Sequence, residues 1–69
     1  MKISYDPEVD ALDIVFQEGV YSESREISED IVIDYSKDGK MLSIEILNAS
    51  TKLSLERIGE VSVSIPVAT

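Results

Sequence analysis

The fold is decided by the opening stretch Lys2-Ile3-Ser4-Tyr5-Asp6-Pro7-Glu8-Val9-Asp10-Ala11-Leu12-Asp13-Ile14-Val15-Phe16. Apolar and polar side chains alternate on both sides of an acidic segment that contains a proline. A period of two is typical of a β-strand with one buried face. The stretch therefore predicts two short strands joined by a turn. Their apolar positions are Ile3, Tyr5, Leu12, Ile14 and Phe16.

The same period continues through the middle of the chain. Residues 20–28 alternate with few apolar side chains and mixed charges, which predicts an exposed edge strand. Residues 31–47 alternate on both sides of Asp38-Gly39, and an Asp-Gly pair between two such runs is a strong hairpin signal. We therefore expect an antiparallel hairpin over residues 31–47, with its turn at residues 36–40.

The period changes near the C-terminus. Ser50 or Thr51 is suited to cap a short helix, and Gly59 is suited to end it. Residues 61–67 then alternate again, which predicts a last strand with Pro66 at an edge or a strand end.

These elements predict one α+β, mostly β domain over residues 1–69. We expect an antiparallel meander sheet of about five or six short strands, with one short helix near the C-terminus. The predicted core residues are Leu12, Ile14, Ile33, Ile44 and Ile46. One short helix covers only part of such a sheet, and a chain of 69 residues without cysteine has no disulfide to support it. We therefore expect a homodimer, with the C-terminal strand either closing the sheet or pairing with the partner.

The charge balance narrows the range of partners. Fourteen Asp and Glu against six Lys and Arg give a net charge of −8. This charge disfavours direct binding to nucleic acid or to an anionic membrane, and it would steer a basic protein partner. The predicted partner-facing acidic surface consists of Glu18, Glu23, Glu26, Glu29 and Asp30. Met1-Lys2-Ile3 begins like a strand and unlike a signal peptide, so we expect a cytoplasmic location.

Several segments together resemble the bacterial and archaeal family DUF2283, a small domain of unknown function. They are Ile3 to Ile14, Ser24 to Ile27, Ile31 to Lys40 and Ser43 to Ser50. The resemblance covers about residues 1–52 and leaves residues 53–69 outside. It implies a compact β-rich domain with no established activity, cofactor or catalytic residue. Family members are similar in size and charge to small antitoxin-like partners of compact ribonuclease-type proteins.

Two sets of carboxylates invite a chemical reading. Asp6, Glu8 and Asp10 alternate like calcium ligands, but Ala11 replaces the glycine and Gln17 the glutamate that a calcium loop requires. We expect a solvated turn in which Asp6 accepts backbone hydrogen bonds. The second set, Asp13, Asp34 and Glu45, lies on the polar sides of predicted strands and is expected to face water, because acid–base catalysis would need a pocket.

No histidine is present to activate a serine, and no glycine-rich loop is present to hold a phosphate. We therefore predict that the protein is not an enzyme and has no catalytic, cofactor or metal-binding residue. The first functional hypothesis is a non-catalytic protein-interaction module, antitoxin-like in binding a basic partner. The alternative is a binder of a small molecule or metal ion, with its site at a homodimer interface.

Overall fold

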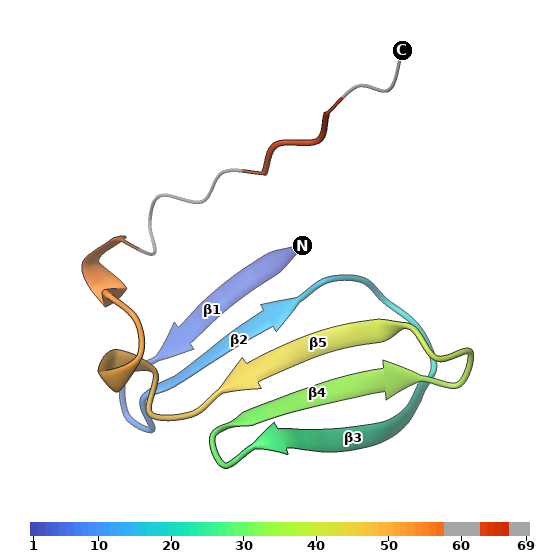
Figure 1. Cartoon of the computed structure of the whole chain (residues 1–69), viewed down its shortest axis with the longest axis horizontal. Helices are drawn as coiled ribbons and strands as arrows, with labels where there is room; N and C mark the ends of the chain where they lie inside the picture. Colours follow the sequence, from blue (N-terminus) through green and yellow to red (C-terminus); the bar gives the residue numbers. More distant parts are fainter. Residues whose placement is uncertain (58–62, 67–69) are drawn as a thin grey trace.

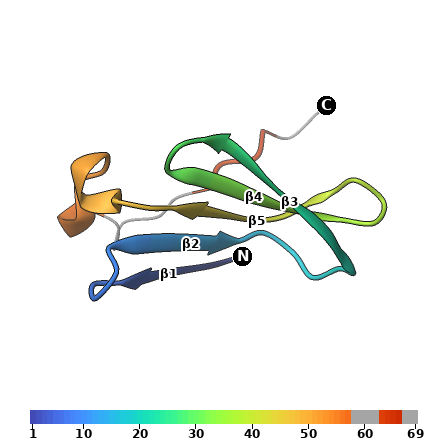
Figure 2. The ribbon, with the colours of Figure 1, turned by 90° about the horizontal axis from the view of Figure 1, so that it is seen from below.

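The computed structural model describes residues 1–57 and 63–66. Its strands form one antiparallel sheet in a single twisted layer (Figures 1 and 2). They are β1 (Lys2–Asp6), β2 (Ala11–Val15), β3 (Tyr21–Ser28), β4 (Ile31–Ser36) and β5 (Met41–Ile46). Two 3-10 turns follow, η1 (Ala49–Thr51) and η2 (Leu55–Arg57). The prediction of a mostly β, antiparallel fold is confirmed.

The hairpin predicted over residues 31–47 is formed by β4 and β5. Ile33 lies opposite Ile44 in this pair. Gly39 has a φ of 84°, a left-handed conformation that glycine adopts without the steric cost of a Cβ. The Ser36 amide donates to the Lys40 carbonyl at 2.9 Å, and this bond closes the turn.

The strand order corrects the predicted meander. The order is β1-β2-β5-β4-β3, so β2 pairs with β5 and β3 lies at the far edge. Ile14 of β2 lies opposite Ile44 of β5, and Leu12 lies opposite Ile46. The physical reason is polarity, because β3 is exposed along its whole length and suits an edge. The apolar β5 can instead be flanked by strands on both sides.

Side chains on the two faces of the sheet differ sharply in polarity. On β1, β2, β4 and β5 the apolar face carries Ile3, Tyr5, Leu12, Ile14, Ile31, Ile33, Tyr35, Ile44 and Ile46, and on the edge strand β3 it carries the polar Glu23, Arg25 and Ser28. The polar face carries Lys2, Ser4, Asp6, Ala11, Asp13, Val15, Ser24, Glu26, Val32, Asp34, Ser43 and Glu45. Residues paired across antiparallel strands share a face, so each set follows from the register.

Burial on the apolar face is incomplete. Leu12 and Ile33 are 3% and 6% exposed, which confirms them as core residues, whereas the other predicted core residues, Ile14, Ile44 and Ile46, stay half-buried. Leu42 and Ala49 are also buried, although neither was among the predicted core residues. No large side chain among the described residues is completely enclosed. A single layer of strands explains this, since it covers its apolar side chains only with their neighbours in the same sheet.

The predicted C-terminal helix is not confirmed. Its place is taken by η1 and η2, and Asn48 precedes η1 with a left-handed φ of 51°. Ser50, expected as a helix cap, instead donates its hydroxyl to Asp10 at 2.6 Å. So short a segment gains little from helical hydrogen bonds, because helix nucleation is costly. Gly59, the predicted end of the helix, lies outside the described residues.

The predicted C-terminal strand is only partly described. Residues 63–66 belong to no strand, and the remainder of residues 61–67 lies outside the described residues. Figure 1 shows the described part of this tail beyond the outer side of β1. Separately, none of the helices in the described part of the chain is long and apolar enough to cross a membrane.

Candidate functional site

A row of carboxylates crosses the polar face. Asp13 lies directly opposite Glu45, Glu45 lies opposite Val32, and Val32 lies opposite Glu26. Like charges placed directly opposite each other on a sheet repel and lower its stability. The row from β2 to β3 contains no basic residue, so its negative charge is not neutralised within the row.

Asp34 lies beside this row and is held by two hydroxyls. Ser24 on β3 donates to one of its carboxylate oxygens at 2.5 Å, and Ser43 on β5 donates to the other at 2.8 Å. Asp13, Asp34 and Glu45 thus share one face, as the sequence suggested. They lie on an open sheet surface, and none of them lines the hollow described below. This arrangement can attract cationic groups, but it provides no enclosed site for acid–base chemistry.

The predicted acidic surface is divided by the fold. Glu18 precedes β3 and Glu29 follows it, so an eight-residue strand of about 26 Å separates them. Glu23 is paired with Arg25 at 2.7 Å on the edge strand. Glu26 and Glu29 are exposed, and Glu26 also belongs to the polar face. Glu23 shares the apolar face with Tyr35, whereas Glu26 shares the polar face with Val32, so these carboxylates mark the β3 edge rather than one face.

Asp30 has a structural role at the other end of that set. One of its oxygens accepts a hydrogen bond from Lys52 at 2.7 Å, and the other accepts one from Asn48 at 3.0 Å. The Lys52 ammonium, followed by the Asn48 amide, lowers the pKa of the Asp30 carboxyl below its ordinary value. These contacts join the β3–β4 turn to the segment after β5, so Asp30 is less available to a partner than the sequence suggested.

The three carboxylates spaced like calcium ligands, Asp6, Glu8 and Asp10, do not converge on one point. Asp6 accepts a hydrogen bond from the Glu8 amide at 2.9 Å, which confirms the expected turn. Asp10 instead accepts hydrogen bonds from the Tyr5 hydroxyl at 2.7 Å and from both the amide and hydroxyl of Ser50. Within residues 1–57 and 63–66, no group of three or more Asp or Glu is placed to hold a metal ion.

The hydrogen bonds to Asp10 stabilise its ionised form. The Ser50 hydroxyl, then the Tyr5 hydroxyl, lowers the pKa of the Asp10 carboxyl. The same contact with Asp10 raises the pKa of the Tyr5 phenol. Asp10 also has a left-handed φ of 53°, and its carbonyl accepts a hydrogen bond from the Ala49 amide at 3.0 Å. Asp10 therefore ties the β1–β2 turn to η1.

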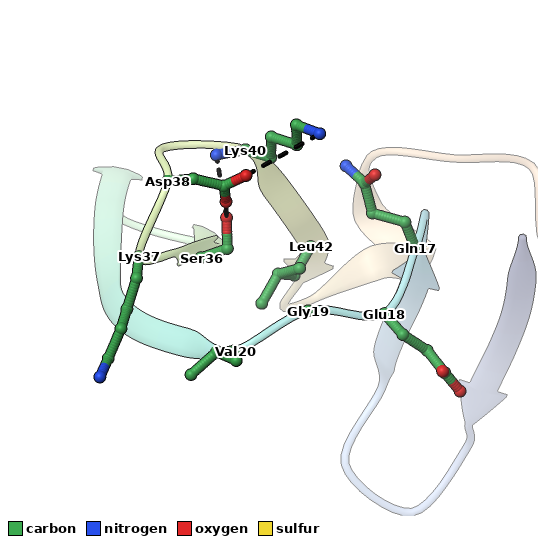
Figure 3. Close-up of a pocket in the computed structure, with 9 residues that line it drawn as sticks. All are labelled: Gln17, Glu18, Gly19, Val20, Ser36, Lys37, Asp38, Lys40 and Leu42. Atoms are coloured by element: carbon green, nitrogen blue, oxygen red, sulfur yellow. Dashed lines mark hydrogen bonds and ion pairs between the residues drawn. The ribbon is translucent and has the colours of Figure 1, made fainter.

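A hollow of about 310 Å³ lies at the opposite end of the sheet, between the β2–β3 connection and the β4–β5 turn (Figure 3). Its lining residues are Gln17, Glu18, Gly19, Val20, Ser36, Lys37, Asp38, Lys40 and Leu42. Ser36 donates its hydroxyl to Asp38 and accepts a hydrogen bond from the Lys40 amide at 3.0 Å. The Lys40 ammonium lies 3.8 Å from Asp38. The hollow is small and open, and its charged lining residues are two lysines and two carboxylates.

Sequence reasoning did not find this hollow. Its residues come from two turns that the sequence places 16 or more positions apart, and only the unexpected path from β2 to β3 brings them together. The signal available was Gly19, whose absent side chain lets the connection lie against Leu42. A Cβ at Gly19 would lie 2.8 Å from Leu42 Cδ2.

Comparison with known proteins places this architecture in a family. Residues 2–50, which include all five strands, match the family described as a protein of unknown function, DUF2283. The chain belongs to the DUF2283 family. This DUF2283 domain is also 40% identical over 57 residues to an uncharacterized protein of Methanocaldococcus jannaschii. The alignment covers 83% of this chain and 48% of that protein, so the chain spans about half the length of that relative.

The search of solved structures finds no significant match to this DUF2283 domain. The family assignment confirms the resemblance drawn from the sequence, and it carries no activity with it.

Proposed function

We propose that this DUF2283 domain is a cytoplasmic, non-catalytic interaction module that binds a basic protein through its polar face. The observation that carries the proposal is the row of Asp13, Glu45 and Glu26 across the sheet. A protein that holds and neutralises a basic partner, in the manner of an antitoxin, fits this role.

Charge and shape support the proposal. Lys2 is the only basic residue at a strand position on the polar side of the sheet, and it lies at one end of β1. An open surface of one sign of charge accelerates association with an oppositely charged protein. Opposed carboxylates such as Asp13 and Glu45 also reduce stability, and a cationic partner would relieve that repulsion.

The test is a capture experiment with a neutralised polar face. Wild-type protein and the triple variant Asp13→Asn, Glu26→Gln and Glu45→Gln are tagged and used to isolate proteins from the source cells at low and moderate salt. We expect the wild type to retain a stoichiometric basic protein and the variant to retain at least tenfold less, because the attraction is electrostatic. The substitutions remove a repulsion, so the sheet itself should remain folded.

A matched control carries Glu8→Gln, Glu18→Gln and Glu56→Gln. These three exposed residues lie outside the strands and therefore off the polar face. Each variant neutralises three carboxylates, so the control and the polar-face variant have the same net charge. It should retain the partner. If both variants lose the partner equally, only the total charge matters. If both retain the partner equally, the polar face is not the binding surface.

A second variant set tests the β3 edge as a binding surface. Charge reversal at Glu23, Glu26 and Glu29 should slow association with the same partner and weaken its dependence on salt. Stopped-flow measurement of the association rate across a salt series checks this. Unchanged rates would restrict the binding surface to the interior of the polar face.

A second candidate function is binding of a small molecule in the hollow of Figure 3. The hollow lies at the small end of the volume range for ligand pockets, and its lining offers two lysines and two carboxylates to a polar ligand. A thermal-shift screen of metabolites and divalent cations tests it. A ligand present at 100 times its dissociation constant should stabilise the protein by about 2.7 kcal/mol, whereas a flat screen excludes this function for the compounds tested.

A further inference from the structure

The described residues leave the apolar face of the sheet only partly covered. Its seven other isoleucine and tyrosine side chains remain half-buried around the core residues Leu12 and Ile33. The central row of the face is aliphatic, with Ile3, Ile14, Ile44 and Ile33 opposite one another on four strands. An aliphatic sheet face in contact with water is unfavourable, because burial of apolar area is the main stabilising contribution in a small domain.

The described part of the C-terminal tail does not cover this face. Val63 and Ile65 are 66% and 81% exposed, so their apolar side chains pack against little of the molecule. Figure 1 places this segment beyond the outer side of β1.

The charge on the apolar face is balanced, in contrast to the polar face. Arg25 and Glu23 lie opposite Ile33 and Tyr35, and they pair with each other at 2.7 Å. The Arg25 guanidinium also lies 4.9 Å from the centre of the Tyr35 ring, where cation and ring attract each other. A molecule of net charge −8 can therefore approach a copy of itself through this face without bringing unpaired strand carboxylates together.

We propose that the apolar face is the contact surface of a homodimer, in which two copies pack sheet against sheet. Two such faces related by a twofold axis are self-complementary in their chemistry, and stacked sheets pack about 10 Å apart. Five strands about 4.8 Å apart and about 17 Å long give each copy a face of roughly 400 Å² before side-chain relief is counted. Stable interfaces bury about 800 Å² per partner, so we expect a reversible dimer rather than a permanent one.

The arrangement would turn both polar faces outward. Each copy would then keep its Asp13–Glu45–Glu26 row accessible, with the carboxylates of the two copies separated by two sheets. The dimer does not depend on the basic partner proposed above, and its failure would leave that proposal standing.

The direct test uses a mixture of equal parts isotope-labelled and unlabelled wild-type protein at about 1 mM, a concentration that populates even a weak dimer. Isotope-filtered nuclear Overhauser spectra then detect contacts between copies only. We expect contacts from the methyl groups of Ile14 and Ile44 to the other copy. Contacts between copies at the β1 or β3 edge alone would overturn the proposal, as would a monomeric mass of 7.6 kDa in sedimentation at the same concentration.

A pair of variants tests the same surface independently. Ile44→Thr places a hydroxyl on the apolar face, and Val32→Thr places one on the polar face, where the residue is also half-buried. We expect Ile44→Thr to raise the dimer dissociation constant at least tenfold and Val32→Thr to leave it within twofold. The reverse order, or equal effects in two folded variants, would overturn the proposal. If Ile44→Thr unfolds, the Overhauser contacts between wild-type copies decide whether the proposal stands.

Discussion

Asp10 shows how one side chain organises one end of this small sheet. Its carboxylate accepts hydrogen bonds from Tyr5 on β1 and from Ser50 in η1, and its carbonyl accepts one from the Ala49 amide. The left-handed φ of 53° is a conformation that Asp and Asn tolerate better than other residues with a side chain. This position therefore requires a residue that tolerates a left-handed backbone conformation and carries a negative charge. Substitution by asparagine keeps the first property and removes the second.

Asp10→Asn should keep the turn and reduce the pH dependence of stability. The folded-state pKa of Asp10 is lowered, first by Ser50 and then by Tyr5. A group with a depressed pKa stabilises the protein above its unfolded-state pKa, and this contribution is lost as the pH falls through its folded-state pKa. Urea unfolding of both proteins at about pH 7 and about pH 3 measures the difference.

The wild type should lose more stability between those two pH values than Asp10→Asn does. Asp30 and Asp38 also have lowered pKa values, the first through Lys52 and the second through Ser36, so the variant should retain part of the dependence. An identical loss in both proteins would mean that Asp10 is not stabilised by its charge.

Leu12 is the clearest test of the core at the same scale. It is 3% exposed on the apolar face, whereas Leu53 after η1 is 39% exposed. Leu12→Ala should lower the free energy of unfolding by about 2–5 kcal/mol, and Leu53→Ala by roughly 0.5 kcal/mol or less. Chemical denaturation checks both. Equal effects would mean that Leu12 is not in a well-packed environment.

The connection from β2 to β3 determines the arrangement of the elements. It carries the chain past β5 and β4 to the far edge, and Gly19 lies against Leu42 along this path. The Lys37 amide donates to the Val20 carbonyl at 3.0 Å and fixes the end of the connection to the β4–β5 turn. The close approach of Gly19 to a buried leucine is thus what permits the strand order.

Gly19→Ala should destabilise the wild type but not a Leu42→Ala background. The new Cβ would lie 2.8 Å from Leu42 Cδ2, and overpacking of this kind costs about 1 kcal/mol or more. With Leu42 truncated, the clash is absent, and Gly→Ala then stabilises by about 0.4–1 kcal/mol through the unfolded chain. A double-mutant cycle by urea unfolding measures this coupling. Additive effects would contradict the contact.

The elements also show how far sequence reasoning reached. Local patterns were sufficient for the β4–β5 hairpin, where alternation and Asp38-Gly39 act within a few residues. Local patterns did not predict the pairing of β2 with β5. That pairing depends on which strands are apolar enough to lie in the middle of the sheet, and a local pattern does not compare distant strands. The C-terminal helix failed for a related reason, since Ser50 bonds to Asp10 from 40 positions away and no local pattern records that contact.

The candidate site was only partly predictable for the same reason. The period of two placed Asp13, Asp34 and Glu45 on polar sides of strands, and the register then placed them on one face. It did not separate Glu18 from Glu29, and it did not indicate that Asp30 binds Lys52. The sequence contains no periodic signal for the contacts of an exposed carboxylate. Those contacts are therefore known only from the folded structure.

At the scale of the whole molecule, the sheet separates two kinds of surface. The polar face holds the carboxylate row that we propose for a basic partner, and the apolar face holds the aliphatic row that we propose for a second copy. Both proposals follow from one property of the fold, a single layer of strands whose two faces differ in polarity. The central claim is that the two faces act separately.

The most direct test of this claim is a dilution series of methyl-labelled wild-type protein followed by NMR. Ile14 and Ile44 lie on the apolar face, while Val15 and Val32 lie on the opposite side of the same sheet. We predict that the isoleucine methyl resonances shift with concentration and that the valine resonances stay fixed. Resonances that all stay fixed up to about 1 mM, or that shift equally on both sides, would contradict the account.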